Sequence, residues 1–341
     1  MTFNIPAPQL IDPQSVPSLR WGIYGTGWIS EEFAMSAIKF TNQQMTSVAS
    51  RTPGKAQQFA EKVGVAEFDE SYESLAARDD IDAIYIATRP ERHLEDALIA
   101  INAGKHVLVE KPLTIDPDEA RQLWAAAKAK GVFAMEAMWS RYLPQASVVR
   151  QIQEQGMLGK PRLLLADFCQ DQRDNPARWG NNPSTPTYDM GIYMVALSIQ
   201  FFGYPTRIQA MGTMHESGVV GEATATLHYA DGARAIFTVS GISHAPHHAT
   251  ISGDVGVVEY LTPFFVPSGI KYSAAEFNVP QTTWVDDLGP VGHQGMNYEA
   301  TAFASYVQQG FTESPIHPHE ESVRALEIVA EIIRQVKATA S

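Results

Sequence analysis

Short apolar runs alternate with longer amphipathic segments from Leu19 to about residue 140. The apolar runs predict β-strands at Trp21–Tyr24, Met45–Ser50, Ala83–Ala87, His106–Glu110 and Val132–Glu136. The run Ala83–Ala87 is apolar throughout, which is typical of a parallel strand buried on both faces. The segments between the runs predict helices at Ile29–Phe40, from Thr52-Pro53 to Gly64, at Glu91–Ala103 and at Asp116–Lys130. Repeated strand–helix units predict an α/β fold with a doubly wound parallel sheet.

After Arg141 the pattern changes to strands that follow one another through short turns. The predicted strands are Arg162–Asp171, Arg207–His215, Ala223–Tyr229, Ala233–Ser240, Ala249–Gly253 and Val257–Tyr260. The dipeptide Asp231-Gly232 supplies the positive φ of a tight hairpin turn. Helices are predicted at Gln145–Gln155, Tyr188–Phe202, Met296–Gln309 and Glu320–Lys337. This half therefore predicts an α+β domain with an open, mainly antiparallel sheet, one face of which a second subunit would cover.

The change of pattern divides the chain into three predicted parts. Residues 1–18 form an extended, proline-rich arm, residues 19–140 the doubly wound Rossmann domain, and residues 141–341 a domain for substrate binding and oligomerisation. The arm carries Pro6, Pro8, Pro13 and Pro17. Such a segment either is disordered or lies along the body of the protein or a partner subunit.

Composition excludes several classes of function. The chain of 341 residues has 25 Lys and Arg against 38 Asp and Glu, a net charge of −13, which repels nucleic acid and anionic membranes. The one cysteine, Cys169, excludes an intrachain disulfide, and its place in a predicted strand favours a buried hydrophobic role over a nucleophilic one. No apolar run reaches membrane-spanning length and residues 1–17 lack the plan of a secretory signal, so we expect a cytoplasmic protein.

The turn after the first predicted strand indicates a dinucleotide site. Glycines in a strand–turn–helix context let the backbone approach a pyrophosphate, which the free N–H groups of the helix then bind. The residues expected to contact the dinucleotide here are Gly25, Thr26, Gly27, Trp28 and Ile29. The third position of the fingerprint holds Ser30 instead of Gly or Ala, so the match is slightly loosened.

The end of the second strand favours NADP over NAD. An NAD site usually has a carboxylate about twenty residues past the glycines, but this chain has Ser50-Arg51-Thr52. Arg51 can pair with a 2′-phosphate and stack on the adenine, and Ser50 and Thr52 can donate hydrogen bonds. A solvated surface arginine is the alternative.

A lysine follows the fourth predicted strand, at Glu110-Lys111-Pro112. Ligands of an open parallel sheet bind beyond the carboxyl ends of its strands, so Glu110 and Lys111 are expected beside the nicotinamide. An ammonium group there can polarise a hydroxyl or carbonyl and stabilise a developing alkoxide.

Five segments carry a resemblance that covers nearly the whole chain after Leu19. They are Gly25–Ile29, Ala103–Leu113, Met135–Pro144, Asp189–Tyr193 and Gly295–Ala300. On these segments the sequence resembles the glucose-fructose oxidoreductase, inositol dehydrogenase and MocA (Gfo/Idh/MocA) family. It looks most like the branch with dimeric dihydrodiol dehydrogenases and NADP-dependent D-xylose dehydrogenases. The resemblance implies an oligomer, a homodimer or homotetramer, through the C-terminal sheet, and a Lys111-Pro112 bond that is cis.

The resemblance also implies the catalytic residues. Many members have a histidine base four residues after an aspartate, and here that place holds Tyr193, as in the dihydrodiol and xylose branch. Asp189 and Tyr193 stand four apart on a predicted helix, so both face the same way. Tyr193 would carry the hydroxyl proton, Lys111 would stabilise the substrate oxygen, and Asp189 would hold another hydroxyl or position Lys111. Alternatively, Tyr193 is a core aromatic residue and Asp189 a helix cap.

Further residues are candidates for the substrate crevice or the nicotinamide. Trp139, Arg141, Arg178 and Trp179 are expected to line the crevice, with ordinary packing as a comparable explanation for each. Thr88 and His93 lie in a segment that the family places near the nicotinamide; a surface histidine at a helix start is the alternative for His93.

Some features depart from the family or suggest a metal. Arg89 stands where the family usually has Pro, and residues 183–188 replace a Gly-Gly-Ala-Leu stretch, so both can reshape the pocket. Histidines occur at His244, His247, His248, His317 and His319. We interpret the first three as a turn and the last two as a helix approach, and expect no metal site.

Together these observations predict an NADP-dependent oxidoreductase. It would transfer a hydride between nicotinamide and a hydroxyl-bearing carbon of a sugar, polyol or trans-dihydrodiol. The alternative is a non-catalytic NAD(P)-binding regulatory protein of the same fold, which would be free to lose the pair Lys111 and Tyr193. A purely structural subunit leaves the glycine loop and Arg51 unexplained.

Overall fold

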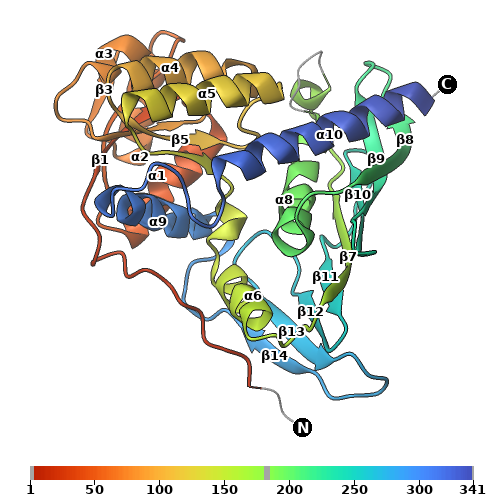
Figure 1. Cartoon of the computed structure of the whole chain (residues 1–341). Helices are drawn as coiled ribbons and strands as arrows, with labels where there is room; N and C mark the ends of the chain where they lie inside the picture. The colour runs from red at the N-terminus through yellow and green to blue at the C-terminus, as the bar shows by residue number, and fades with distance from the viewer. Residues whose placement is uncertain (1–3, 180–184, 340–341) are drawn as a thin grey trace. The chain divides into compact units, whose positions relative to one another are not determined.

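The computed structural model describes residues 4–179 and 185–339, and the chain divides into two compact units. One unit comprises residues 10–143 and 290–323, and we call it the parallel-sheet unit. The other comprises residues 1–9, 144–289 and 324–341, and we call it the mixed-sheet unit. Figure 1 gives the course of the chain through both.

The parallel-sheet unit is built on six strands in the order β3-β2-β1-β4-β5-β6. The strands are β1 (Arg20–Tyr24), β2 (Gln44–Ala49), β3 (Glu67–Asp69), β4 (Ala83–Ile86), β5 (His106–Glu110) and β6 (Ala134–Ala137). All neighbouring pairs are parallel, and every residue of β4 is buried. The predicted doubly wound sheet is confirmed, and its continuous apolar strand lies where both faces are covered.

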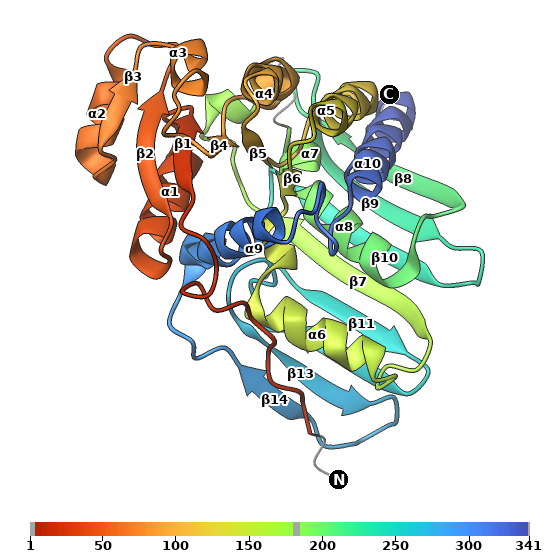
Figure 2. The ribbon, with the colours of Figure 1, turned by 60° about the vertical axis from the view of Figure 1, so that its left-hand side comes forward.

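Helices cover both faces of this sheet. They are α1 (Trp28–Phe40), α2 (Lys55–Val63), α3 (Tyr72–Ala76), α4 (His93–Asn102), α5 (Pro117–Lys130) and α9 (Met296–Gln308). Helices α3, α4 and α5 lie side by side, whereas α1 packs against α9 on the opposite side of the sheet (Figure 2). Because Gly64 and Gly131 adopt positive φ at the ends of α2 and α5, they stop these helices as predicted.

Two predicted helix starts are wrong. Residues Thr52–Lys55 form a turn in which Lys55 N donates to Thr52 O, so α2 begins at Lys55 after Gly54. The segment from Glu91 begins instead as a 3₁₀ turn, η1 (Pro90–Arg92), and α4 starts only at His93.

Helix α9 returns to the parallel sheet although more than 150 residues separate the two in sequence. Its Phe303 is fully buried, and its ring centroid lies 4.7 Å from that of Trp21 on β1 and 4.9 Å from that of Phe133. These contacts make α9 part of the core of the parallel-sheet unit.

The mixed-sheet unit contains eight strands in the order β14-β13-β12-β11-β7-β10-β9-β8. The strands are β7 (Pro161–Cys169), β8 (Arg207–Met214), β9 (Val220–His228), β10 (Arg234–Ser240), β11 (Ala249–Gly253), β12 (Gly256–Tyr260), β13 (Gly269–Ala274) and β14 (Thr282–Val285). Only β7 and β10 pair in parallel, which confirms the mainly antiparallel sheet. Gly232 has φ +86° in the predicted hairpin turn between β9 and β10.

Helices lie on one side of this sheet (Figure 1). They are α6 (Pro144–Glu154), α7 (Pro186–Asp189), α8 (Gly191–Phe202) and the part of α10 (His319–Thr339) after Val323. On the other side, the side chains of Leu165 and Met211 are 45% and 68% exposed. The helix predicted at Tyr188–Phe202 is in fact two helices, α7 and α8, because the chain breaks at Met190.

The proline-rich arm lies along α6 of its own mixed-sheet unit. The backbone N–H of Gln9 donates to Ser147 Oγ at 2.8 Å, and Ser147 Oγ donates back to Gln9 O at 3.0 Å. One turn further, Gln151 Nε2 donates to Ala7 O at 2.8 Å. Of the two possibilities left open, residues 7–9 therefore take the ordered one. Within residues 4–179 and 185–339, no helix has both the length and the apolar character needed to cross a membrane.

Candidate functional site

The turn between β1 and α1 has the geometry of a phosphate-binding loop. Gly25 has φ +99°, and a Cβ built on it would lie 2.7 Å from Ala87 O. At Gly27, a built Cβ meets no other described atom within 4 Å. Gly27 is the N-cap of α1 and brings no side chain to the first N–H groups of the helix. An open backbone cradle at an uncapped helix start fits a pyrophosphate.

An aromatic row lies beside this loop. Trp28, the first residue of α1, is 59% exposed, and its ring centroid lies 4.7 Å from that of His293 in η4 (Gly292–Gly295). The His293 ring in turn lies 5.2 Å from that of Trp139. Burial, and then the positive charge of Lys111, lower the pKa of His293, so this imidazole lies near the candidate catalytic lysine. Sequence analysis missed His293, because nothing in its spacing distinguishes it from a turn histidine.

Arg51 is held by carboxylates at the end of β2. Its guanidinium forms an ion pair with buried Asp96 and a longer one, 3.4 Å, with Glu95. It also lies over the ring of Tyr72, 4.8 Å from the centroid. Thr88 Oγ1 donates to Asp96 at 2.7 Å, so Thr88 and Arg51 share one carboxylate. The Arg51 side chain is 40% exposed, so it remains open to a ligand while Asp96 fixes its direction.

The Lys111 loop, residues Glu110–Leu113, follows β5. Its Lys111-Pro112 peptide is cis, as the resemblance implied. Lys111 N donates to Glu110 Oε2 at 3.1 Å, and Tyr85 Oη donates to Glu110 Oε1 at 2.6 Å. Leu113 N donates to Glu136 Oε1 at 2.9 Å. Side-chain carboxylates thus hold the backbone on both sides of Pro112.

His93 lies beneath this loop and is buried, so the alternative of a surface histidine is wrong. Its Nδ1 lies 3.0 Å from Leu113 O, and its Nε2 lies 3.2 Å from Thr88 O. Burial lowers the pKa of His93, so the ring is neutral and donates its one N–H to one of these carbonyls. His93 joins the Lys111 loop to the end of β4.

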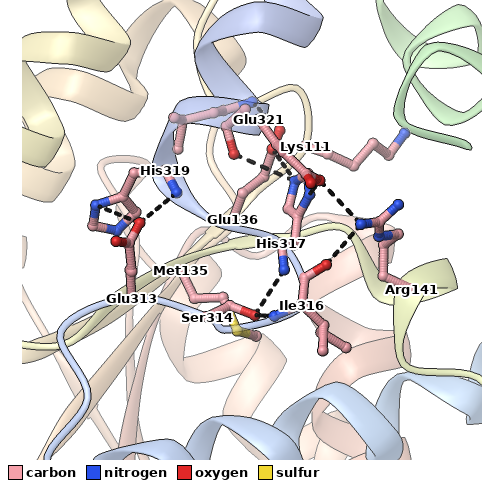
Figure 3. Close-up of polar contacts among 12 residues, drawn as sticks. Lys111, Met135, Glu136, Arg141, Glu313, Ser314, Ile316, His317, His319 and Glu321 are labelled. Atoms are coloured by element: carbon pink, nitrogen blue, oxygen red, sulfur yellow. Dashed lines mark hydrogen bonds and ion pairs between the residues drawn. The ribbon is translucent and has the colours of Figure 1, made fainter. Parts of the chain in front are cut away.

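A buried ionic cluster supports the loop from the other side (Figure 3). His317 Nε2 lies 2.8 Å from Glu136 Oε2, and His317 Nδ1 lies 3.2 Å from Glu321 Oε2. Arg141 donates to Glu321 at 3.0 Å and to Ile316 O at 2.7 Å. Arg141, expected to line the substrate crevice, is thus engaged in this cluster.

The groups of this cluster are charged despite their burial. Burial opposes the imidazolium of His317, but the hydrogen bonds that it donates to Glu136 and Glu321 outweigh burial and raise the pKa of His317. Burial likewise opposes the Glu136 carboxylate, but the hydrogen bond and charge of His317 lower the pKa of Glu136. Both shifts favour an imidazolium that faces a carboxylate.

Glu299 on α9 is another buried acid of the same unit. Neither of its carboxyl oxygens has a hydrogen-bond partner among the described residues. Burial, and then the charge of Glu110, raise the pKa of Glu299 well above its usual value. The carboxyl group is therefore neutral in the folded protein under mildly acidic conditions.

This raised pKa predicts a pH-dependent loss of stability. The favourable protonation of folded Glu299 is fully present below its unfolded pKa of 4.5 and is lost as the pH rises towards its folded pKa. Glu299→Gln cannot ionise, so it does not lose stability in this way as the pH rises. We therefore expect the free energy of unfolding of Glu299→Gln minus that of the parent to increase by up to about 1.4 kcal/mol per pH unit in that range. Urea unfolding from pH 5 to pH 8 measures the difference, with the exposed Glu154→Gln on α6 as control. Parallel curves for parent and Glu299→Gln would contradict the prediction.

In the mixed-sheet unit, Tyr193 and Asp189 lie on different helices. Tyr193 is buried in the first turn of α8, with its ring centroid 5.7 Å from that of Phe168 and 5.6 Å from that of Phe265. Asp189 ends α7 and forms an ion pair of 2.9 Å with Arg178. The premise that Asp189 and Tyr193 share one continuous helix is wrong because the helix is interrupted at Met190.

Trp179, Arg89 and the segment 183–188 were predicted to shape the substrate pocket. Trp179 is buried, donates from Nε1 to Gln172 O at 2.7 Å and stacks on His215 with centroids 4.0 Å apart. Arg89 is exposed at the start of η1. Of residues 183–188, Pro183 and Ser184 lie outside the described residues, and Thr185 is the N-cap of α7.

Cys169 and the histidine turn lie together at the end of β7. Burial raises the pKa of the Cys169 thiol to about 11, which favours the inert thiol. The ring nitrogens of His244 and His247 lie 3.3 Å and 3.0 Å from Cys169 O. In the part of the chain that the structure describes, no group of three or more His, Cys, Asp or Glu side chains is placed to hold a metal ion.

Comparisons with known proteins cover most of the chain. A family model described as "Oxidoreductase family, NAD-binding Rossmann fold" matches residues 19–138, and one described as "GFO/IDH/MocA C-terminal domain" matches residues 147–259. The trans-1,2-dihydrobenzene-1,2-diol dehydrogenase of Mus musculus is 33% identical over 325 residues, which cover 94% of this chain and 96% of that protein. The protein of the same name from Homo sapiens is 31% identical with the same coverage, 94% and 96%.

Solved structures of oxidoreductases share the fold of this chain. KijD10, a 3-ketoreductase from Actinomadura kijaniata in complex with NADP and TDP-benzene, is 26% identical with a TM-score of 0.78, covering 94% of this chain and 98% of that chain. A levoglucosan dehydrogenase in complex with NADH and levoglucosan has a TM-score of 0.83 over 94% of this chain and 98% of that chain. At 18% identity this second likeness shows the fold alone.

Proposed function

The chain belongs to the Gfo/Idh/MocA family of nicotinamide-dependent oxidoreductases, and from this premise we propose that it transfers a hydride between NADP and a hydroxyl-bearing carbon of a trans-dihydrodiol, polyol or sugar. The observation that carries the proposal lies within one unit. The open loop Gly25–Gly27 and Lys111 both follow strands of the parallel sheet, at the edge where such sheets bind dinucleotides. The relatives named as dehydrogenases of a dihydrodiol support the substrate class.

The chain's own residues supply charge stabilisation and proton transfer. When bound, the nicotinamide accepts or supplies the hydride. We propose that the Lys111 ammonium stabilises negative charge on the substrate oxygen. Tyr193 takes the hydroxyl proton as the phenolate in oxidation and returns it as the phenol in reduction. Asp189, fixed by its ion pair with Arg178, holds a second hydroxyl of the substrate.

The chemistry can be tested directly. Purified protein is incubated with NADP⁺ or NAD⁺ and a panel of trans-dihydrodiols, polyols and aldoses, and formation of the reduced nicotinamide is followed by absorbance. Dicarbonyls and keto-sugars with NADPH test the reverse direction. Turnover of a diol or sugar supports the proposal. Tight nucleotide binding without turnover in either direction would favour the non-catalytic regulator instead.

Arg51 is expected to select NADP. Losing its guanidinium removes a charge-assisted hydrogen bond to the 2′-phosphate, which is worth about 1.5–3 kcal/mol. We therefore expect Arg51→Gln to raise KM for NADP⁺ about ten-fold to a hundred-fold and to change KM for NAD⁺ less than about three-fold. Steady-state kinetics with both cofactors measure this, with Arg92→Gln, which removes another ion pair to Glu95, as matched control. An equal rise for both cofactors would show that Arg51 does not recognise the 2′-phosphate.

We propose that the uncovered face of the mixed sheet joins two or more copies of the chain. The exposed Leu165 on β7 stands in register with Ile236 on β10 and Thr250 on β11, so apolar and hydroxyl side chains form a continuous row across three strands. Leu165→Arg would bury an unpaired charge, which costs several kcal/mol, so we expect the dissociation constant of the oligomer to rise at least about a hundred-fold. Sedimentation velocity measures it, with Val255→Arg in the turn before β12 as control. An unchanged mass for Leu165→Arg would exclude this face as the interface.

A further inference from the structure

The position of Lys111 depends on the backbone that carries it. In the Lys111 loop, Lys111 N donates to Glu110 and Leu113 N to Glu136, while Leu113 O lies 3.0 Å from His93 Nδ1. Among them, Glu136 is buried and its carboxylate is itself held by a further charged group, His317. Figure 3 shows the Lys111 side chain extending away from His317 and Glu136, so the cluster reaches the lysine through its backbone.

The two oxygens of Glu136 have separate tasks. Oε1 accepts the hydrogen bond from Leu113 N at 2.9 Å, while Oε2 faces His317 Nε2 at 2.8 Å. A carboxylate that bridges two donors in this way has a fixed plane, because rotation about its last bond would break both contacts. The plane of Glu136 therefore fixes the place of Leu113 N, two residues from Lys111.

Stability alone does not explain a buried charged pair here. Exchanging such a pair for packed apolar residues is often neutral or stabilising, since both ions lose their hydration on burial. The pair is surrounded by further polar groups. Glu321 and Ser322 from α10 contact His317, and Arg141 from η2 (Trp139–Arg141) donates to Glu321. His319, two residues on, is held separately by Ala134 O and stacks on Trp124.

We propose that Glu136 and His317 are positioning residues for Lys111: the Glu136 carboxylate, oriented by His317, fixes the backbone of Leu113 and thereby the direction of the lysine. This inference rests on the proposed role of Lys111 in turnover. Removing the carboxylate frees Leu113 N and lets the loop relax, and a displacement of about 1 Å at a catalytic group can cost about a hundred-fold in rate. The loss falls on kcat and leaves nucleotide affinity unchanged.

The first readout needs neither cofactor nor turnover. Reductive ¹³C-methylation labels the lysines of the unliganded chain, and the Lys111 signal is assigned by its absence in Lys111→Met. We expect this signal to shift in Glu136→Leu and in His317→Leu. It should return to the parental position in Glu136→Gln, whose amide oxygen can still accept from Leu113 N. Arg78→Met is the matched control, because the Arg78 ion pairs with Asp69 and Asp80 lie at the other end of β5, near Lys105.

The second readout is a double-mutant cycle in turnover. We expect Glu136→Leu to lower kcat about ten-fold to a hundred-fold in the parent and less than about three-fold in the Lys111→Met background. Glu136→Gln should recover kcat to within about three-fold of the parent. Equal losses in both backgrounds, with an unshifted Lys111 signal, overturn the inference and leave a purely structural pair. If the leucine variants fail to fold, Glu136→Met, which keeps the length of the side chain but has no carboxylate oxygen to accept from Leu113 N, takes their place, and an unshifted Lys111 signal in that variant overturns the inference. Absence of turnover in the parent concerns the proposed function instead, and the Lys111 signal then decides alone.

Discussion

Lys111→Met and Tyr193→Phe are each expected to lower kcat about a hundred-fold to a ten-thousand-fold while changing the affinity for NADP less than about three-fold. Removing a group that stabilises a developing oxyanion typically costs about a hundred-fold to a thousand-fold, and loss of a positioned acid–base group costs a similar factor. Neither change removes volume from a core, because Met keeps most of the lysine stem and Phe keeps the ring that packs against Phe168 and Phe265. Stopped-flow absorbance of the reduced nicotinamide separates the hydride step from product release.

The matched control for Tyr193→Phe is Tyr229→Phe, which removes the phenolic hydroxyl of another buried tyrosine in the same unit. We expect its kcat within about two-fold of the parent, since it should perturb packing alone. Because residues that act on one chemical step are not additive, the double variant Lys111→Met with Tyr193→Phe should be little slower than the slower single variant. A kcat for Tyr193→Phe within three-fold of the parent would remove Tyr193 from the proton-transfer role and favour its interpretation as a core aromatic residue.

Gly27→Ala is expected to separate nucleotide binding from folding. Gly27 has φ −77°, which alanine adopts without strain, and a Cβ there meets no described atom, so the free energy of unfolding should stay within about 0.5 kcal/mol of the parent. The same methyl group would occupy the space in which a pyrophosphate approaches the backbone. We expect the dissociation constant for NADPH, measured by calorimetry, to rise about a hundred-fold.

Gly25→Ala serves as the comparison for Gly27→Ala. Gly25 needs its positive φ, and a Cβ would press on Ala87 O, so this variant should lose both stability and nucleotide affinity. If Gly27→Ala binds NADPH as the parent does, the loop is a structural turn and the nucleotide binds elsewhere.

Periodicity predicted the elements well where the pattern is local. The apolar run of β4 and the glycines that end α2 and α5 could be placed from the sequence because burial on two faces and a positive φ each leave a direct trace. Strands β13 and β14 were missed: β14 is a four-residue edge strand with no buried residue, and β13 has six residues but no regular alternation of apolar and polar positions. The break at Met190 was missed although Gly191 follows it directly, because a single glycine inside an apolar helical pattern is compatible with one continuous helix.

The sequence predicted the residues of the candidate site but not the buried residues that hold them in place. Motifs indicated Gly25, Gly27 and Lys111, because their chemistry depends on residue type at fixed spacing. Glu136 and His317 meet across 181 positions of sequence, and no pattern within either segment indicates that contact. Arg141 is a similar case: the sequence predicts that it lines the substrate crevice, and no pattern near it indicates the hydrogen bond of its guanidinium to Glu321.

Because α9 packs on the parallel sheet, the core of the parallel-sheet unit cannot be completed until late in the synthesis of the chain. During synthesis the strands β1 to β6 leave the ribosome long before Phe303, whose ring completes the packing around Trp21 and Phe133. An apolar surface of the nascent sheet therefore stays uncovered until the 166 residues that follow Ala137, up to and including Phe303, have been made (303 − 137). At about 5–20 residues per second this takes about 8 to 33 seconds. Over that interval residues 10–143 expose apolar surface to which chaperones can bind. A fragment of residues 10–143 alone should therefore aggregate, whereas a fragment that also contains residues 290–323 should fold.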